Sequence, residues 1–155
     1  MAVSNKNKKV VQRAEPGGKH IVQGGDPNRY YLEYPAWSFE DADKELWAFT
    51  QEHIGDLFWD EILPRMRALE TQQWQEILVA GKKENHSISA GDLSTVAQTR
   101  LADRHIEAES ILSLRVTGTH RLYGYMVRQV FHLLWVDLEH GDNSKCVCRS
   151  HKKHT

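Results

Sequence analysis

The chain has 155 residues, of which 40% are hydrophobic and 26% charged, and its formal net charge is −1. This length and composition predict one globular domain with a core that needs neither disulfides nor metals, and we expect no cofactor. No apolar run approaches the roughly 20 residues of a membrane helix, and no signal peptide follows the start, so we expect a cytoplasmic protein with no membrane partner.

Residues 1 to 29 contain several lysines and arginines, two glycine- and proline-containing breaks and few apolar side chains. This composition predicts a flexible basic arm, followed by a single domain over residues 30–155. Arg29 to Glu33 resembles a short strand, and Pro35 disfavours a central position in a sheet just there.

Apolar residues recur at helical spacing from about Asp41 and predict an amphipathic helix that Pro64 ends or kinks. Asp41 and Asp43 would lie at the positive end of its dipole. The residues that share its apolar face are Leu46, Phe49, His53, Ile54, Leu57, Phe58 and Ile62.

Two further helices are predicted before residue 102. One covers Thr71 to Val79, with Thr71 as its N-cap and Gly81 after its end. The other begins with the capping-box-like segment Ser89 to Asp92. Its apolar register contains Leu93, Val96, Ala97, Arg100 and Leu101.

The last third of the chain alternates in the manner of strands, which we expect over about residues 111–151. Leu112, Leu114 and Val116 share one face up to the break at Gly118. A second run covers Arg121 to Val127, a turn follows near Arg128 and Gln129, and the apolar run Val130 to Val136 suits a strand buried on both faces at the centre of the sheet. Helices first and strands last predict an α+β fold, with N-terminal helices packed on a C-terminal antiparallel sheet.

The order of residues within about 107–143 resembles the core of the RelE/ParE toxin superfamily. The matching residues are Leu114, Arg115, Gly118, Arg121, Leu122, Tyr125, Asp137 and His140. The whole chain is also similar to a broader group of uncharacterised bacterial and phage-borne proteins, through Leu134, Trp135, Asp137, His140 and the basic ending Lys152-Lys153-His154-Thr155.

The resemblance implies a RelE-like sheet and a metal-independent endoribonuclease, a hydrolase of the toxin–antitoxin type or a decayed relative of one. The expected partners are RNA or the ribosome and a small antitoxin protein. The alternative is a non-catalytic nucleic-acid-binding or protein-binding module. Two features depart from the family: some one hundred residues precede the core, and the chain is not basic overall. A protein that binds ribosomal RNA usually needs a strongly positive field.

Charge is distributed unevenly along the chain. Eight carboxylates and one lysine lie between Ser38 and Glu61, whereas seven lysines and arginines, three carboxylates and five histidines lie from Ser110 to Thr155. The basic residues therefore gather where the resemblance predicts a site.

Metal-free RNA cleavage needs a base, an acid and cations that stabilise the transition state. We assign His140 as general acid or base with Asp137 orienting it, His151 as a second acid or base, and Arg115 and Arg121 as the phosphate grip. The residues expected to bind nucleic acid are Tyr123, Tyr125, Arg149, Lys152 and Lys153. The structural alternative is that Asp137 and His140 cap a turn, the arginines pair with helix carboxylates and the tyrosines pack in the core.

The tail reads Cys146-x-Cys148-x-x-His151-x-x-His154, which contains four ligand types that zinc uses. The cysteines are too close together for an ordinary disulfide framework, and we interpret them as thiols. Because Cys-x-Cys on a strand places both thiols on one face, we expect a strand with a basic end and no metal, and zinc stays an open possibility.

Overall fold

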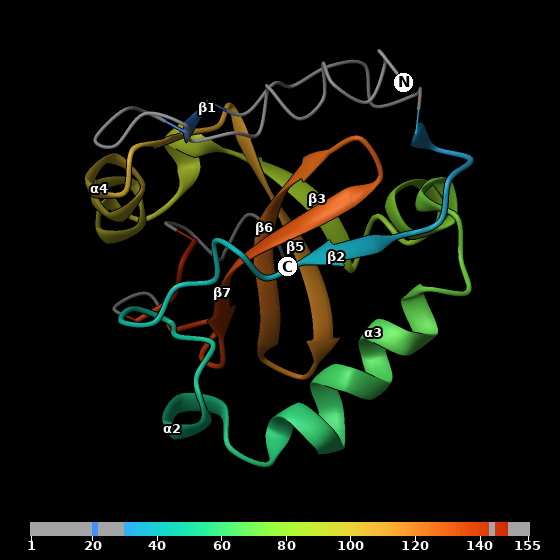
Figure 1. The fold of residues 1–155 in the computed structure, drawn as a ribbon, viewed down its shortest axis with the longest axis horizontal. Coiled ribbons are helices and arrows are strands. Elements are labelled where there is room, and N and C mark those ends of the chain that lie inside the picture. The colour runs from blue at the N-terminus through green and yellow to red at the C-terminus, as the bar shows by residue number, and fades with distance from the viewer. Residues whose placement is uncertain (1–19, 22–29, 143–144, 149–155) are drawn as a thin grey trace.

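The computed structural model describes residues 20–21, 30–142 and 145–148. Its centre is a five-stranded sheet in the order β2-β7-β6-β5-β3 (Figure 1). The strands are β2 (Ala36–Ser38), β3 (Asn85–Ser89), β5 (Ser110–Thr117), β6 (His120–Val127) and β7 (Val130–Asp137). A separate parallel pair joins β1 (His20–Ile21) to β4 (Ile106–Glu107).

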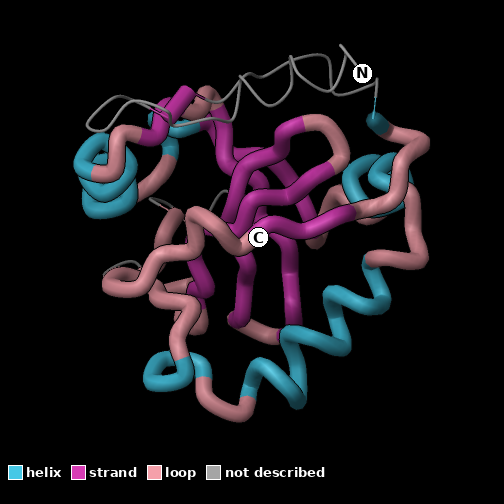
Figure 2. Tube along the Cα trace, viewed as in Figure 1, coloured by secondary structure: helices cyan, strands magenta, loops and turns pink. Residues whose placement is uncertain are grey.

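Short helices surround this sheet (Figure 2). They are α2 (Gln51–Ile54), the π-helix η2 (Phe58–Ile62), α3 (Leu63–Leu69), the π-helix η3 (Glu76–Ala80), the 3₁₀-helix η4 (Ala90–Asp92) and α4 (Thr95–Asp103). The predicted α+β class is therefore confirmed. No helix in the described part of the chain is long and apolar enough to cross a membrane.

Strands β5, β6 and β7 form an antiparallel meander, and their bounds agree closely with the predicted runs. Gly118 has φ 49° in the first turn, and Arg128 has φ 56° in the second. The sequence placed the buried run of β7 at the centre of the sheet, but β6 is the central strand. Strand β2 pairs in parallel with the outer side of β7, so Pro35 precedes an edge strand, where a missing N–H is tolerated.

The sheet is covered on both faces, because alternate residues of each strand belong to different cores. Ile111, Tyr123 and Tyr125 pack with Ala97 and Leu101 of α4. The other face joins the side chains of η2, α3 and η3 to Leu112, Leu114, Leu122, Phe131, Leu133 and Val136. The middle of β5 and of β6 is therefore buried on both faces, as are seven of the eight residues of β7.

The long helix expected from Asp41 to Pro64 is wrong. Before α2, the carboxylate of Asp43 accepts hydrogen bonds from the N–H groups of Glu45 and Leu46 at 2.8 and 3.1 Å. Such local side-chain bonds compete with helix formation. Pro64 lies in the first turn of α3, where the proline needs no N–H partner, so the helix runs through it.

The third predicted helix begins later than expected. Residues 90–92 form η4, and the N-cap of α4 is Ser94, whose hydroxyl accepts from the N–H of Ala97 at 3.2 Å. The second predicted helix is the segment that ends in η3, although Thr71 does not cap it, because its hydroxyl donates to Ala68 O at 2.7 Å.

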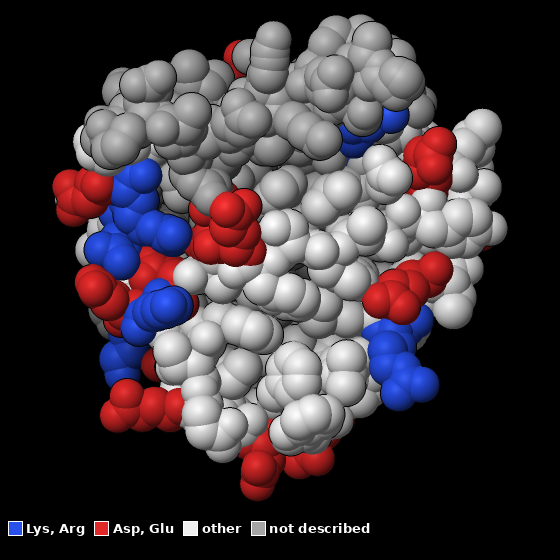
Figure 3. All heavy atoms as spheres, viewed as in Figure 1, with Lys and Arg blue, Asp and Glu red and all other residues white. Residues whose placement is uncertain are grey.

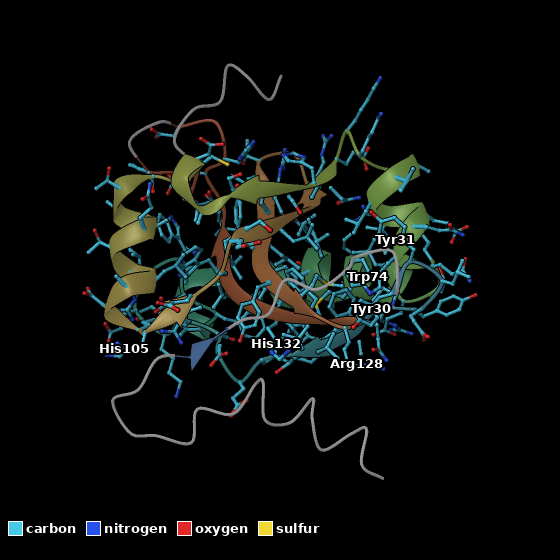
Figure 4. All side chains as sticks on the ribbon, turned by 90° about the horizontal axis from the view of Figure 1, so that it is seen from above. Tyr30, Tyr31, Trp74, His105, Arg128 and His132 are labelled. Atoms are coloured by element: carbon cyan, nitrogen blue, oxygen red, sulfur yellow. The ribbon has the colours of Figure 1, made fainter. Side chains whose placement is uncertain are left out.

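The expected strand at Arg29–Glu33 is a turn in its described residues, with Glu33 N donating to Tyr30 O at 3.0 Å. Trp74 N in turn donates to Glu33 O at 2.9 Å, and the Arg128 guanidinium lies over the Tyr30 ring at 5.4 Å. Figure 4 shows Tyr30, Tyr31, Trp74 and Arg128 together on one side of the molecule. These contacts dock the turn against η3 and the β6–β7 hairpin. Apart from His20 and Ile21, the expected basic arm lies outside the described residues.

Candidate metal centre

The C-terminal loop is tied to the end of β7 by one carboxylate. Asp137 is fully buried, and its two oxygens accept hydrogen bonds from Glu139 N at 2.8 Å and Val147 N at 2.9 Å. The loop that contains His140 and Cys146 is thus held to the end of β7 at Glu139 and at Val147. Asp137 takes the turn-capping role that the sequence left as its structural alternative.

Further backbone contacts fix the same loop. His140 N donates to Thr119 O at 3.1 Å, and Ser94 N donates to Val147 O at 2.7 Å. Cys148 forms a single β-bridge with Leu93, just before α4. The loop is therefore held by the β5–β6 turn, by β7 and by the start of α4.

This arrangement brings an imidazole and two thiols together. One ligand atom each from His140, Cys146 and Cys148 lies within 4.8 Å of the other two. The Cys146 Sγ to His140 Nδ1 distance is 3.6 Å, and Cys148 N donates to Cys146 Sγ at 3.3 Å. Both cysteines are buried, neither is in a disulfide, and His140 is partly exposed.

A tyrosine hydroxyl completes the cluster. Tyr123 Oη lies 3.1 Å from Cys148 Sγ and 3.3 Å from His140 Nδ1, and its side chain is fully buried. Tyr123 belongs to the central strand β6, so its hydroxyl is held in place by the sheet.

Burial and mutual hydrogen bonds shift the pKa values of Tyr123, Cys146 and Cys148. The hydrogen bond with Cys148, together with burial, raises the pKa of Cys146. The hydrogen bonds from Cys146 and then Tyr123 lower the pKa of Cys148, although burial opposes them, and burial raises the pKa of Tyr123. Cys148 is therefore the thiol that ionises first, and removing a second proton from this buried cluster requires a compensating positive charge.

The distances suit a tetrahedral ion. Zinc–sulfur bonds of about 2.3 Å and zinc–nitrogen bonds of about 2.0 Å place neighbouring ligand atoms roughly 3.5 Å apart. The separation of 3.6 Å between Cys146 Sγ and His140 Nδ1 matches that edge. A cavity of ≈ 340 Å³, lined in part by Trp47, His53 and Ser94, reaches the cluster at Cys146.

The predicted phosphate grip lies beside this cluster. In the strand register, Arg115 of β5 lies opposite Arg121 of β6, and Arg121 lies opposite Asp137 of β7. Arg121 donates to Gly118 O at 2.6 Å and to His120 O at 3.1 Å. Burial, and then the charge of Arg115, lower the pKa of the Arg121 guanidinium. Neither arginine forms an ion pair with a described carboxylate, so the helix pairing that the sequence allowed is not formed there.

Other predicted site residues have different surroundings. Tyr123 and Tyr125 are 0% and 1% exposed, which removes both rings as platforms for a base. The Tyr125 hydroxyl donates to the Asp41 carboxylate, and its ring stacks on His132 at 4.7 Å. Both tyrosine side chains pack in the core, which was the structural alternative in the sequence analysis. Asp137 is hydrogen-bonded to two backbone N–H groups of the loop, and its expected role of orienting His140 stays a prediction. The predicted residues Arg149, His151, Lys152, Lys153 and His154 lie outside the described residues.

The sequence grouped the two cysteines with His151 and His154, whereas the described residues bring them to His140. The available signal was the Asp137-x-x-His140 turn followed by Cys146-x-Cys148, since such a turn folds a short loop back toward its own strand. No family model, curated protein or solved structure matches this chain. The RelE/ParE resemblance therefore stays a prediction.

Proposed function

We propose that this protein binds a zinc ion through His140 Nδ1, Cys146 Sγ and Cys148 Sγ. The observation that carries the proposal is that these atoms lie within 4.8 Å of one another on a loop fixed independently by buried hydrogen bonds. Thiolate and imidazole ligands favour zinc over hard cations, which prefer oxygen ligands.

The surroundings support an ion at this point. Two thiolates would neutralise Zn²⁺, and the buried Tyr123 hydroxyl would donate to Cys148 as an outer hydrogen bond of the kind that orients zinc ligands. A water molecule would supply the fourth ligand. The ion would join the C-terminal loop to β6 and β7, so its binding free energy would add to the stability of the fold.

The test measures metal content and cobalt spectra. Purified wild-type protein should contain one zinc per chain, and Co²⁺ should give thiolate charge-transfer absorption together with tetrahedral visible bands. Cys148→Ser and His140→Ala should lose both. His105→Asn is the matched control, because His105 is exposed and its φ of 59° is tolerated by asparagine. Folded wild-type protein that binds neither ion contradicts the proposal, as does unchanged affinity in Cys148→Ser.

A second candidate is RNA cleavage, favoured by the register that puts Arg115 opposite Arg121 and Arg121 opposite Asp137, three residues before His140. In this reaction His140 takes the 2′-hydroxyl proton, the 2′-oxygen attacks phosphorus, and the 5′-oxygen leaves with a proton from a second acid, for which we keep His151. The paired guanidinium groups would hold the phosphate.

A chelator separates the two candidates, because it should remove zinc from the metal centre but should not affect metal-independent cleavage. Metal-independent cleavage should continue in EDTA, should disappear in His140→Ala and Arg121→Ala, and should arrest growth on induction with new messenger RNA ends. Intact RNA and normal growth, with folded protein present, would leave the zinc centre or a non-catalytic binding module. Activity in EDTA from protein that also binds zinc would show that the metal-free form is the nuclease.

A further inference from the structure

Four aromatic rings form a continuous row at the surface, far from the cysteine loop in the sequence. Phe39 stacks on Phe49 at 5.2 Å, Phe49 meets Phe58 at 5.9 Å, and Phe58 meets Trp59 at 4.9 Å. The two outer rings are the most exposed, because 43% of Phe39 and 65% of Trp59 are accessible. We call these four rings the aromatic row.

The row is built by three elements. Phe39 follows β2, Phe49 precedes α2, and Phe58 and Trp59 begin the π-helix η2. The inner rings Phe49 and Phe58 also pack against the core beneath the sheet, so the row rests on a rigid base. An exposed tryptophan on such a base is typical of protein–protein contacts, where tryptophan carries much of the binding energy.

The charged residues next to the row in the sequence are mostly acidic. Glu40, Glu52, Asp56 and Asp60 are exposed neighbours of these rings in the sequence, and Lys44 is the only lysine or arginine from Ser38 to Glu61. The face in Figure 3 has few charged side chains in its middle and lower part, with acidic groups at its lower edge and basic groups at its left and right sides. Apolar contact at the centre with carboxylates at the rim attracts a cationic partner.

We propose that the aromatic row is a docking surface for a basic amphipathic helix of a partner protein. Its apolar face would cover Phe39 and Trp59, and its lysines or arginines would meet the surrounding carboxylates. A second copy of this chain is a poorer occupant, because the same acidic rim would face itself across a two-fold axis. Charge complementarity therefore selects the basic helix.

The test uses a fluorescent synthetic peptide whose leucines form one helical face and whose lysines form the other, and a counterpart with glutamate in place of lysine. Fluorescence anisotropy measures binding to the full chain. The lysine peptide should bind and the glutamate peptide should not. Trp59→Ala should weaken binding about tenfold or more, the loss expected for a tryptophan that becomes buried in the interface. The double variant Asp56→Asn, Asp60→Asn should weaken binding at low salt and flatten its salt dependence.

Val96→Ala is the matched control, since Val96 is 54% exposed on α4, away from the row. It should bind the lysine peptide as the wild type does, and circular dichroism should show that every variant is folded. Equal binding by Trp59→Ala and Val96→Ala overturns the proposal, as does equal binding of the two peptides. Sedimentation that reveals a dimer lost in Trp59→Ala would assign the surface to a second copy instead.

Discussion

The carboxylate of Asp137 accepts a hydrogen bond from Val147 N at 2.9 Å, and this contact closes the loop that carries His140 and Cys146. The other carboxylate oxygen accepts from Glu139 N at 2.8 Å, so one buried side chain fixes both ends of the loop. The thiols reach the imidazole because of this contact, and the cluster depends on a residue that offers no ligand to it.

Asp137→Asn tests this dependence. An amide can accept from one of the two N–H groups but cannot accept at its nitrogen, so one buried N–H loses its partner. We expect a loss of roughly 1–3 kcal/mol in the free energy of unfolding, measured in urea, and a weaker cobalt affinity. Glu139→Gln, an exposed neighbour, should stay within about 0.5 kcal/mol of wild type. Wild-type stability and cobalt affinity in Asp137→Asn would show that the loop closes without this carboxylate.

The Asp43 carboxylate accepts several hydrogen bonds from both backbone and side-chain donors. Its oxygens accept from Arg100 at 2.8 and 2.9 Å and from Trp135 Nε1 at 3.1 Å. Burial raises the pKa of Asp43, but these hydrogen bonds, that of Arg100 first, hold it well below its ordinary value of 3.8. Its stabilising effect is therefore fully present above the unfolded pKa and is lost as the pH falls through the lower folded pKa.

Asp43→Asn should cost about 3 kcal/mol or more at neutral pH, because it removes the buried counter-charge of the Arg100 guanidinium and leaves only the exposed Glu45. Urea unfolding from neutral pH to about pH 2 should show that the difference in unfolding free energy between wild type and variant becomes smaller as the pH falls. Asp92→Asn, at an exposed aspartate, serves as control. A difference that stays constant with pH would mean that the Asp43 charge contributes nothing.

The start of α4 can be located by two serine substitutions. Ser94→Ala removes the hydroxyl that accepts from Ala97 N and should cost about 1 kcal/mol. Ser89→Ala should cost much less, because Ser89 makes no side-chain cap bond to η4. Thermal unfolding followed by circular dichroism separates the two, and a larger loss in Ser89→Ala would place the cap where the sequence pattern had suggested it.

Gly124 faces the backbone of its neighbouring strand. A Cβ at this position would lie 2.2 Å from His132 O and 2.7 Å from a Phe131 ring carbon, so Gly124→Ala must push β6 and β7 apart. We expect a loss of roughly 1–3 kcal/mol in unfolding free energy. Gly91→Ala, where nothing lies within 4 Å of the added carbon, should change it by less than about 0.5 kcal/mol. Equal effects of the two substitutions would contradict the close approach.

The meander was readable from the sequence because its signals are local. Alternation predicts each strand, whereas the register shift between Arg115 and Thr117, which puts Arg115 opposite Arg121, has no such local signal. The segment around Asp41 and Asp43 was misread, because its apolar spacing is helical while its carboxylates bind Arg100 and Tyr125 from distant elements. Tertiary hydrogen bonds of that kind leave no periodic trace.

The candidate site was readable only in part. His140, Cys146 and Cys148 were each singled out, but the spacing alone did not show that the chain folds back between them. That return depends on Asp137 and on anchors at Leu93 and Thr119, which are distant in sequence. The burial of Tyr123 and Tyr125 could not be predicted either, because alternation does not show whether a given face of a strand is exposed or covered.

The parallel pairing of β2 with β7 carries a consequence for the order of folding. Ala36 pairs with Val130, so this contact closes a loop of most of the described chain, whereas the hairpins of β5, β6 and β7 close over two-residue turns. Short loops close at lower entropic cost. We expect the meander to form first and β2 to dock last. Pulsed amide exchange during refolding should protect β6 before Trp37 and Ser38, and simultaneous protection would contradict this order.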